Sequence, residues 1–356
     1  RRESLWEEVL DSEVTEFEWK FLNSEYTDVI LHNNNRDQTS YLLQSRVGRK
    51  KPLTRKQRAE IWRLKEKYEE LKRQRNVADW QEVYNRVANY LNDNDIRPYT
   101  NVIADEFQDF TNPQLRFLRA LVKEGRNDLF LTGDPFQKIY SNKKMNFSAA
   151  GINVRGKRSQ KLKVNYRTTE EIKRIAVSVV KGQKYDDLDG GEENNKGYVS
   201  LVHGERPSYH MFASAAEEVR QALKYVEACE AEGIPLKDIC IAAKTRALFK
   251  DAQDLLHREG VRYCEVKNGE RQGETDGVSF CTFHSLKGLE YRVVILVGIN
   301  EKNIPSQTPQ AVPDSEDDSD SPEEVRSLLY VAMTRARQMV FLTGYGEPTG
   351  LLEVTK

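Results

Sequence analysis

The chain has 356 residues, which is long enough for two or three domains with sizeable hydrophobic cores. Charged residues make up 31% of it, yet the formal net charge is only -1, so any surface that binds nucleic acid has to be local. The sequence shows no apolar run of membrane-spanning length and no signal peptide, which predicts a cytoplasmic protein without a membrane partner. The four cysteines lack metal-ligand or redox spacing and fit buried, reduced thiols.

Residues 1 to 97 have the apolar periodicity of a helical region. Thr54 and Gln57 form a plausible capping box at the start of a long helix. A later helix is expected to begin behind Asp79 and to bury an apolar stripe. The residues of that stripe are Trp80, Val83, Tyr84, Val87 and Leu91.

A basic stretch lies inside this helical region. Between Arg46 and Arg75, thirteen Lys and Arg side chains face only four glutamates. Two interpretations stay open, a solvated helix face or a track that binds the phosphates of nucleic acid. On the second interpretation, the candidate contacts are Arg49, Lys50 and Lys51.

From residue 98 the pattern changes to alternating strands and helices. An apolar run ends in Asp105-Glu106-Phe107-Gln108-Asp109, which is typical of a buried parallel strand at the ligand-binding edge of its sheet. Asp105 suits Mg²⁺, which prefers one or two carboxylates plus phosphate oxygens. Glu106, offset by one residue, can orient the water that attacks a phosphoryl group. A strand followed by a solvated acidic turn is the alternative.

A second strand is expected at 128–132, and it leads into the turn from Gly133 to Tyr140. Gly133 permits a close backbone approach, because it has no Cβ. Gln137 is an uncharged group that can contact a phosphate. Taken alone, this short motif is more often a plain turn.

Residues 161 onward predict a second α/β unit with a mostly parallel, three-layer sheet. A short strand is expected at 162–167, followed by a helix capped by Thr168 and Glu171. Further strands are expected at 198–202, 239–243, 278–283 and 293–297, with helices near 215–231 and 246–259. Residues 190–196 and 308–320 are polar connectors.

Two further segments of this unit combine charged and small residues. The segment from Thr282 to Glu290 lies between two strands and contains a cation, a glycine and an acid. Ser321-Pro322-Glu323-Glu324 predicts the capped start of a helix that carries Arg335. Such an arginine is either a surface ion-pair partner or, facing a phosphate site, an arginine finger.

Taken together and in this order, the segments resemble the superfamily 1A helicases of the UvrD/Rep/PcrA type. Residues 105–109 resemble motif II, 133–140 motif III, 165–167 motif IV, 282–290 motif V and 330–336 motif VI. The resemblance implies two RecA-like parallel-sheet domains of the P-loop NTPase type, the first incomplete, and an N-terminal helical subdomain. Residues 1–97 would form a 1B-like subdomain, 98–160 the end of domain 1A, and 161–356 domain 2A without a large 2B insertion.

The resemblance also implies roles in ATP hydrolysis. Asp105 would bind Mg²⁺, and Glu106 would activate water. Gln137 would sense the γ-phosphate, with Arg167 and Arg335 as paired arginine fingers. The nucleotide would contact Tyr166, which stacks on adenine, and Lys287, Gly288, Glu290 and Asp134.

On the DNA side, Tyr140 would stack on a base, and Thr282 and His284 would connect the nucleotide site to the DNA channel. The implied function is an ATP-dependent DNA helicase or translocase of DNA repair that moves 3′ to 5′ along single strands. Its cofactors would be ATP and Mg²⁺, and its partners single-stranded DNA or single/double-strand junctions. The alternatives are a non-catalytic DNA-binding or regulatory relative and an RNA-directed motor.

The chain departs from the family pattern in three places. No Gly-x-x-x-x-Gly-Lys-Ser/Thr loop occurs, and the first residue is Arg1 instead of Met. We therefore expect a fragment that lacks the upstream Walker A segment, hydrolyses ATP poorly alone, and pairs with that segment or with other repair proteins. Asn142 stands where the family often has a Trp. The interval from Arg167 to Thr282 leaves little room for a 2B insertion.

Overall fold

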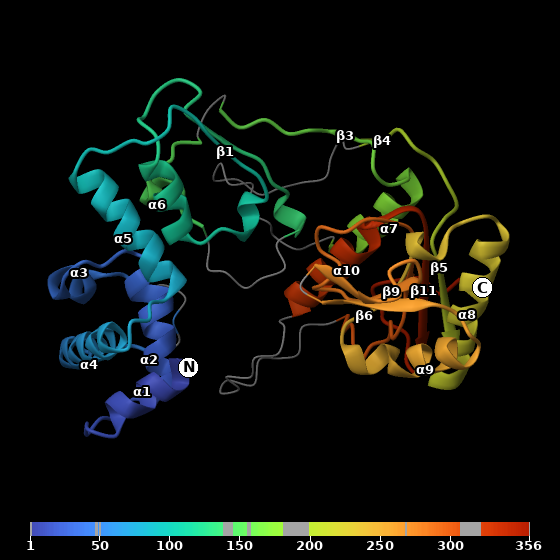
Figure 1. Ribbon diagram of the computed structural model, residues 1–356, viewed down its shortest axis with the longest axis horizontal. Helices are drawn as coiled ribbons and strands as arrows, with labels where there is room; N and C mark the ends of the chain where they lie inside the picture. Colours follow the sequence, from blue (N-terminus) through green and yellow to red (C-terminus); the bar gives the residue numbers. More distant parts are fainter. Residues whose placement is uncertain are drawn as a thin grey trace. The chain divides into compact units, whose positions relative to one another are not determined.

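The computed structural model describes residues 2–46, 49, 51–137, 145–154, 158–180, 199–267, 269–306 and 322–355. The chain divides into two compact units. Unit 1 comprises Arg1–Gly133 and Asn142–Arg158, and unit 2 comprises Asp134–Ser141 and Ser159–Lys356. Figure 1 shows the ribbon of both units, coloured along the chain. Among the described helices, none has both the length and the apolar character needed to cross a membrane.

Unit 1 is mainly helical. Its core contains the stacked rings of Trp6 and Tyr68, whose centroids are 4.0 Å apart. The capping box of Thr54 and Gln57 is confirmed at the start of the longest helix. The helices are α1 (Arg2–Leu10), α2 (Trp19–Glu25), the π-helical η1 (Tyr26–Leu31), α3 (Gln38–Leu43), α4 (Arg55–Gln74), α5 (Trp80–Asp93) and α6 (Asn112–Ala120), with 3-10 turns η2 (Phe107–Asp109) and η4 (Ser148–Ala150).

The buried face of α5 differs from the predicted apolar stripe. Trp80 is 73% exposed and Val87 is also exposed, so the prediction is wrong for these two residues. Polar side chains lie inside because they have partners there: Glu82 accepts a hydrogen bond from Lys72, and Asn85 Nδ2 donates to the Leu31 carbonyl oxygen at 2.7 Å. The buried residues of α5 are Glu82, Asn85, Ala88 and Leu91.

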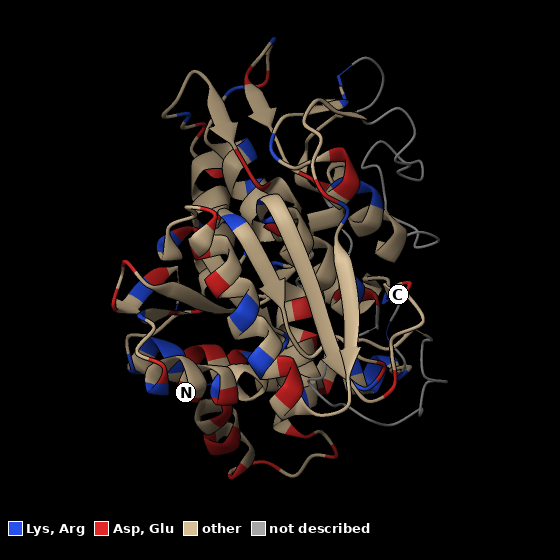
Figure 2. Ribbon diagram, turned by 90° about the vertical axis from the view of Figure 1, so that its right-hand side faces the viewer, with Lys and Arg blue, Asp and Glu red and all other residues tan. Residues whose placement is uncertain are grey.

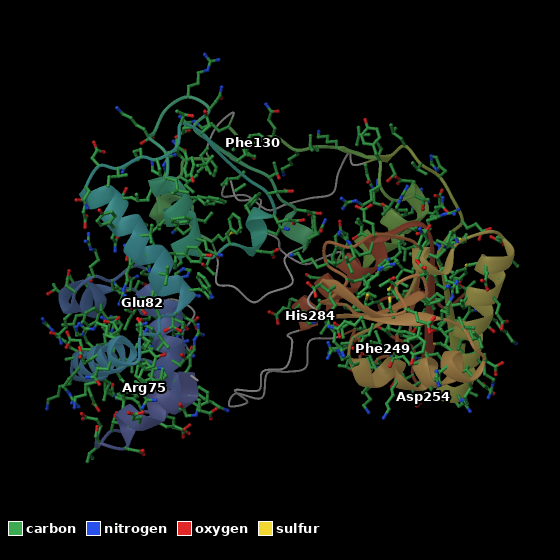
Figure 3. The ribbon with its side chains drawn as sticks, viewed as in Figure 1. Arg75, Glu82, Phe130, Phe249, Asp254 and His284 are labelled. Carbon is green, nitrogen blue, oxygen red and sulfur yellow. The ribbon has the colours of Figure 1, made fainter. Side chains whose placement is uncertain are left out.

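A two-stranded parallel sheet completes unit 1. It pairs β1 (Val102–Ala104) with β2 (Leu129–Leu131), so the predicted parallel strands are confirmed. The prediction of a buried strand is wrong, because the facing pair Ile103 and Phe130 is 79% and 60% exposed. Within the described ranges, no third strand pairs with this sheet. Figure 3 labels Phe130 on it.

Unit 2 is built around a seven-stranded sheet with the order β5-β11-β10-β6-β9-β7-β8. Every neighbouring pair is parallel except β7 with β8, which confirms the predicted mostly parallel sheet. Its middle strands β6 and β9 contain no charged residue, and the strands of Figure 2 are mainly tan. The strands are β5 (Ser208–Phe212), β6 (Ile239–Ala243), β7 (Tyr263–Lys267), β8 (Glu270–Gly273), β9 (Val278–Thr282), β10 (Tyr291–Leu296) and β11 (Ala336–Tyr345).

Helices cover both faces of this sheet, as Figure 1 shows. Cys240 and Ala242 of β6 pack with α7 (Glu170–Val180) and α10 (Pro322–Thr334). The alternate residues of β6 pack with α8 (Ala215–Ala231) and α9 (Lys250–Arg258). The predicted three layers are therefore confirmed in unit 2. The 3-10 turn η5 (Leu236–Asp238) connects α8 to β6, and the 3-10 turn η6 (Arg246–Phe249) connects β6 to α9.

A small parallel ribbon of β3 (Val164–Asn165) and β4 (Val199–Ser200) precedes the large sheet. The helix that follows β3 begins one residue later than predicted, because Thr169 Oγ1, not Thr168, accepts the hydrogen bond from Ile172 N at 3.2 Å. All four cysteines are buried and free, as expected. The connectors at 190–196 and 308–320, and Ser321, lie outside the described residues. The subdomain boundaries at 97 and 160 stay predictions.

Candidate nucleotide and nucleic-acid sites

Asp105 and Glu106 follow β1 at the carboxyl end of the small sheet in unit 1. Asp105 Oδ1 accepts hydrogen bonds from the Thr132 hydroxyl and from Glu106 N, the latter at 2.9 Å. These bonds lower the pKa of Asp105, so its carboxylate is charged at neutral pH. Because both go to Oδ1, Oδ2 keeps its lone pairs, and the group fits a magnesium ligand. In the described part of the chain, no cluster of three or more His, Cys, Asp or Glu could hold a metal.

Glu106 has an unusual backbone. Its φ of 54° and ψ of 37° lie in the left-handed region, which a non-glycine residue occupies at a cost of about 1–3 kcal/mol. Such residues concentrate at active sites, where the surrounding structure holds them. The Glu106 side chain is exposed, and its Oε2 accepts a hydrogen bond from Gln108 Nε2. The backbone thus directs a carboxylate into solvent beside a carboxylate suited to metal binding.

The predicted γ-phosphate sensor Gln137 lies in unit 2. It ends the 3-10 turn η3 (Pro135–Gln137). Its side-chain Oε1 accepts a hydrogen bond from Arg335 Nη2 at 2.8 Å, and its carbonyl oxygen accepts one from Lys287 Nζ at 3.0 Å. Its Nε2 donates to Asp134 Oδ2 at 2.9 Å. The structure therefore brings together four of the residues assigned to the nucleotide site.

Arg335 follows the last residue of α10 and is only 2% exposed. The carbonyl oxygen of Arg335 accepts a hydrogen bond from Tyr291 N at 3.0 Å. This bond holds the Arg335 backbone beside the first residue of β10. Arg335 Nε lies 3.3 Å from the Val331 carbonyl oxygen. A surface ion pair, the alternative left open by the sequence, does not describe this residue.

Arg167 and Glu290 form the second charged contact of this region. Arg167 Nε lies 2.8 Å from Glu290 Oε1. Arg167 N donates to Asn165 Oδ1 at 2.8 Å, which shapes the turn after β3. The neighbouring Tyr166 is 71% exposed, so its ring is open for stacking. Gly288 adopts a φ of +80°, a left-handed conformation that favours glycine.

Thr282 and His284 lie at the carboxyl end of β9. Thr282 Oγ1 and Ser285 Oγ are 2.9 Å apart, and Ser285 N donates to Thr282 Oγ1 at 3.2 Å. These bonds shape the turn that presents His284, which Figure 3 labels beside the sheet. Tyr140, the predicted base-stacking residue, lies outside the described residues.

The basic stretch at 46–75 is largely paired with acids of its own unit. Arg46 Nε lies 2.7 Å from Oε1 of the buried Glu25, and Arg49 lies 3.3 Å from Glu25 and 3.4 Å from Asp28. Lys51 Nζ lies 5.1 Å from the ring centroid of Phe17. Lys50 lies outside the described residues. Phosphate binding by Arg49 and Lys51 stays a prediction, and the ion pairs give Arg49 a structural role.

Two cations of this stretch have a different setting. Arg55 and Lys56 open α4, whose first turn contains no acid, and both are exposed. No ion pair joins either to another of the described residues. Cations at a helix N-terminus oppose the helix dipole, so a bound phosphate would relieve an unfavourable arrangement.

An aromatic row on unit 1 contains Trp80 and Tyr84, for which the sequence predicts a buried stripe, and also Phe117. The ring centroids of Trp80 and Tyr84 are 6.3 Å apart, and those of Tyr84 and Phe117 are 5.5 Å apart. The exposed Trp80 offers one face to a base. Glu82 and Asn85 are buried on the inner face of α5 in place of Trp80.

Two family models match the chain. The model for the UvrD/REP helicase N-terminal domain covers residues 2–150, and that for the UvrD-like helicase C-terminal domain covers residues 253–347. DNA helicase IV of Escherichia coli K12 is 26% identical over 73% of this chain and 36% of its own length. DNA helicase II of the same strain is 34% identical over 30% of the chain and 15% of its own length.

ATP-dependent DNA helicase srs2 of Schizosaccharomyces pombe is 27% identical over 47% of the chain and 19% of its own length. The chain therefore spans between 15% and 36% of the length of these three relatives. The two models match in the order N-terminal domain, then C-terminal domain. The chain belongs to the UvrD/Rep-like superfamily 1A DNA helicases.

Proposed function

We propose that this chain forms the motor of an ATP-dependent DNA helicase or translocase that moves 3′ to 5′ along single-stranded DNA. The cluster of Gln137, Lys287 and Arg335 supports the proposal most directly, since its members come from separate segments of the sequence. Two cations beside a neutral amide match the charge and hydrogen-bonding needs of a terminal phosphate.

The acid pair provides the other half of the chemistry. Bound Mg²⁺ would neutralise charge on the phosphate oxygens, and Asp105 would hold it. Glu106 accepts a proton from the attacking water as that water adds to the γ-phosphorus, and the bond to ADP breaks. Arg335 and Arg167 stabilise the charge that develops on the transferred phosphoryl group.

The remaining nucleotide contacts would come from other residues of unit 2. The ring of Tyr166 would stack on the adenine. It is already exposed, so no side chain has to move away before the adenine can contact it. Glu290, which is paired to Arg167, would contact the ribose hydroxyls. Asp134 and Gly288 complete the set, Asp134 by holding the Gln137 side chain.

DNA binding combines stacking and charge. Trp80 and Tyr140 are the stacking candidates, and Arg55 and Lys56 are the exposed cations of unit 1. Thr282 and His284 are placed at the end of β9, where a phosphate could contact the turn. Single-stranded DNA suits this set because its bases are free to stack.

Hydrolysis needs one element that these 356 residues do not contain, a Gly-x-x-x-x-Gly-Lys-Ser/Thr loop. We therefore define the loop-bearing protein as this chain joined to a strand–loop–helix segment with that sequence. The test is ATP hydrolysis by the loop-bearing protein with and without oligo(dT). Stimulation by DNA supports the proposal, whereas DNA binding without any hydrolysis favours the non-catalytic relative.

A further inference from the structure

Gln108 lies between the proposed catalytic base and the start of motif III. Gln108 is only 1% exposed, and its Nε2 donates a hydrogen bond to Glu106 Oε2. Its Oε1 packs against Gly133 so closely that a Cβ there would overlap it, and the same Cβ would lie 2.7 Å from Phe107 Cδ1. Only glycine therefore fits at 133 while Gln108 keeps this position.

The contact fixes a carboxylate that would otherwise be free to rotate. Glu106 is exposed and has several side-chain torsions, so an unrestrained carboxylate would sample many orientations. Gln108 is buried, and burial restricts its own rotamers. A restrained amide that donates to one oxygen of Glu106 leaves the other oxygen to accept a proton from water.

Gly133 also has a distinctive place in the chain. It is the last residue of unit 1 in this part of the sequence, and Asp134 is the first of unit 2. Asp134 holds the Gln137 side chain, which in turn bonds Arg335. Gly133, which packs against Gln108, and Gln137, which bonds the proposed arginine finger Arg335, are therefore the two ends of a segment of five residues.

We propose that Gln108 is a positioning residue that orients the Glu106 carboxylate and makes this orientation depend on the backbone at Gly133. A change of backbone conformation at 133–134 would then move the Gln108 side chain, and with it the Glu106 carboxylate. This inference rests on the proposed function for its catalytic consequence, but the contact itself can be tested without hydrolysis.

The first experiment uses the chain as it stands. The ¹⁵N-labelled side-chain amide of Gln108, identified by its loss in Gln108→Ala, is followed by NMR at neutral pH in the original chain and in Glu106→Ala. We expect the signals of its two amide protons to be further apart in the original chain, because only there does one of them donate to a carboxylate. An equal separation in both proteins overturns the contact.

The second experiment measures kinetics in the loop-bearing protein. Gln108→Ala should lower kcat by about 10- to 100-fold with KM unchanged, as expected for a misplaced catalytic group. Gln108→Glu restores a donor only when it is protonated, so its rate relative to the original protein should rise as pH is lowered. The same ratio for Gln108→Ala should stay flat. The exposed Gln74→Ala is the matched control, and equal pH dependence in both Gln108 variants overturns the proposal.

A double-mutant cycle tests the role of Gly133. Gly133→Ala should lower kcat more in the original background than in Gln108→Ala, because the overlap with Gln108 is then absent and only that with Phe107 remains. Additive effects contradict the coupling. Thermal unfolding of each variant shows whether it folds. If Glu106→Gln leaves hydrolysis unchanged, the proposed function fails, while the NMR result still decides the contact.

Discussion

Gln137 Oε1 lies 2.8 Å from Arg335 Nη2, although 198 positions separate the two residues in the sequence. A phosphate oxygen could take the place of the amide oxygen, because both are acceptors for the same guanidinium. Arg335→Ala should therefore lower kcat of the loop-bearing protein by about 10³–10⁵, the usual effect of losing an arginine finger. Arg337→Ala, two residues further on and exposed, is the control. Near-normal turnover in Arg335→Ala would show that Arg335 is not an arginine finger.

Replacement of Glu106 separates hydrolysis from binding. Glu106→Gln keeps the shape of the side chain but removes the proton acceptor, so ATP should bind and not be hydrolysed. Asp105, the proposed metal ligand, is unchanged in this variant. Fluorescent-nucleotide titration and phosphate release measure the two properties separately. The exposed Glu124→Gln is the control, and a loss of nucleotide affinity in Glu106→Gln would show that this residue binds ATP instead.

The 356-residue chain by itself should hydrolyse ATP poorly. Without the loop, no Lys or Ser/Thr of that motif holds the β- and γ-phosphates and the metal beside Asp105. Phosphate release by the purified chain, with and without oligo(dT), measures this. Turnover at ordinary enzyme rates, about 1–10³ s⁻¹, would mean that other residues replace the loop.

A buried charge network should control the stability of unit 1. Lys72 is 2% exposed and donates hydrogen bonds to Asp79 Oδ2 at 2.8 Å and to Glu82. Lys72→Met would leave these acids without their buried cation, which should cost about 3–5 kcal/mol. Lys56→Met, at an exposed position of the same helix, should change stability by less than about 0.5 kcal/mol. All four tryptophans lie in unit 1, so tryptophan fluorescence during urea unfolding follows this unit alone.

The same unit should lose stability in acid. Burial opposes ionisation of Asp79, but hydrogen bonds and charge from Lys72 and Arg2 outweigh it and lower its pKa. Hydrogen bonds from Arg63 and Lys67 lower the pKa of Glu13 to about 2. A group with a depressed folded pKa stabilises above its unfolded pKa, so this contribution should disappear as pH falls from about 4 to about 2. A tryptophan-detected melting temperature that is constant over this interval would contradict the prediction.

DNA affinity should separate into a stacking part and a charge part. Trp80→Ala should weaken binding of oligo(dT) by about 1–3 kcal/mol without changing its salt dependence. Arg55→Gln with Lys56→Gln should reduce the log–log salt slope by about 0.7 for each phosphate that these side chains no longer neutralise. Tyr90→Ala, exposed on the same helix as Trp80, and Lys250→Gln, exposed on α9, are the controls. If binding by Trp80→Ala is normal and the slope is unchanged, unit 1 does not hold the strand in this way.

Local sequence patterns predicted where helices and strands occur better than they predicted which side chains of those elements are buried. The capping box of Thr54 and the strand at 239–243 appear where the sequence indicates, because caps and continuous apolar runs are local signals. The face of α5 could not be predicted, since Glu82 is buried by a partner ten positions away, Lys72. In the same way, the burial of Ile103 depends on which strands lie beside β1, which its own sequence does not specify.

The candidate site shows the same limit. Motif order assigned Gln137, Lys287 and Arg335 to one site, and the structure places them within hydrogen-bonding distance. The ion pairs of the basic stretch were not visible in the sequence, because the acid that pairs with Arg46 is Glu25, which lies 21 positions earlier in α2. Charge counted along a sequence cannot show which cations are already neutralised by tertiary ion pairs.

Directional movement on single-stranded DNA tests the central claim most directly. The loop-bearing protein is given oligonucleotides that carry streptavidin on biotin at either the 3′ or the 5′ end. A motor that moves 3′ to 5′ arrives at the 5′ end, so ATP should drive release from 5′-biotin and not from 3′-biotin. Glu106→Gln should abolish the release while DNA remains bound. Release from the 3′ end, or ATP-independent release from both ends, would contradict the account.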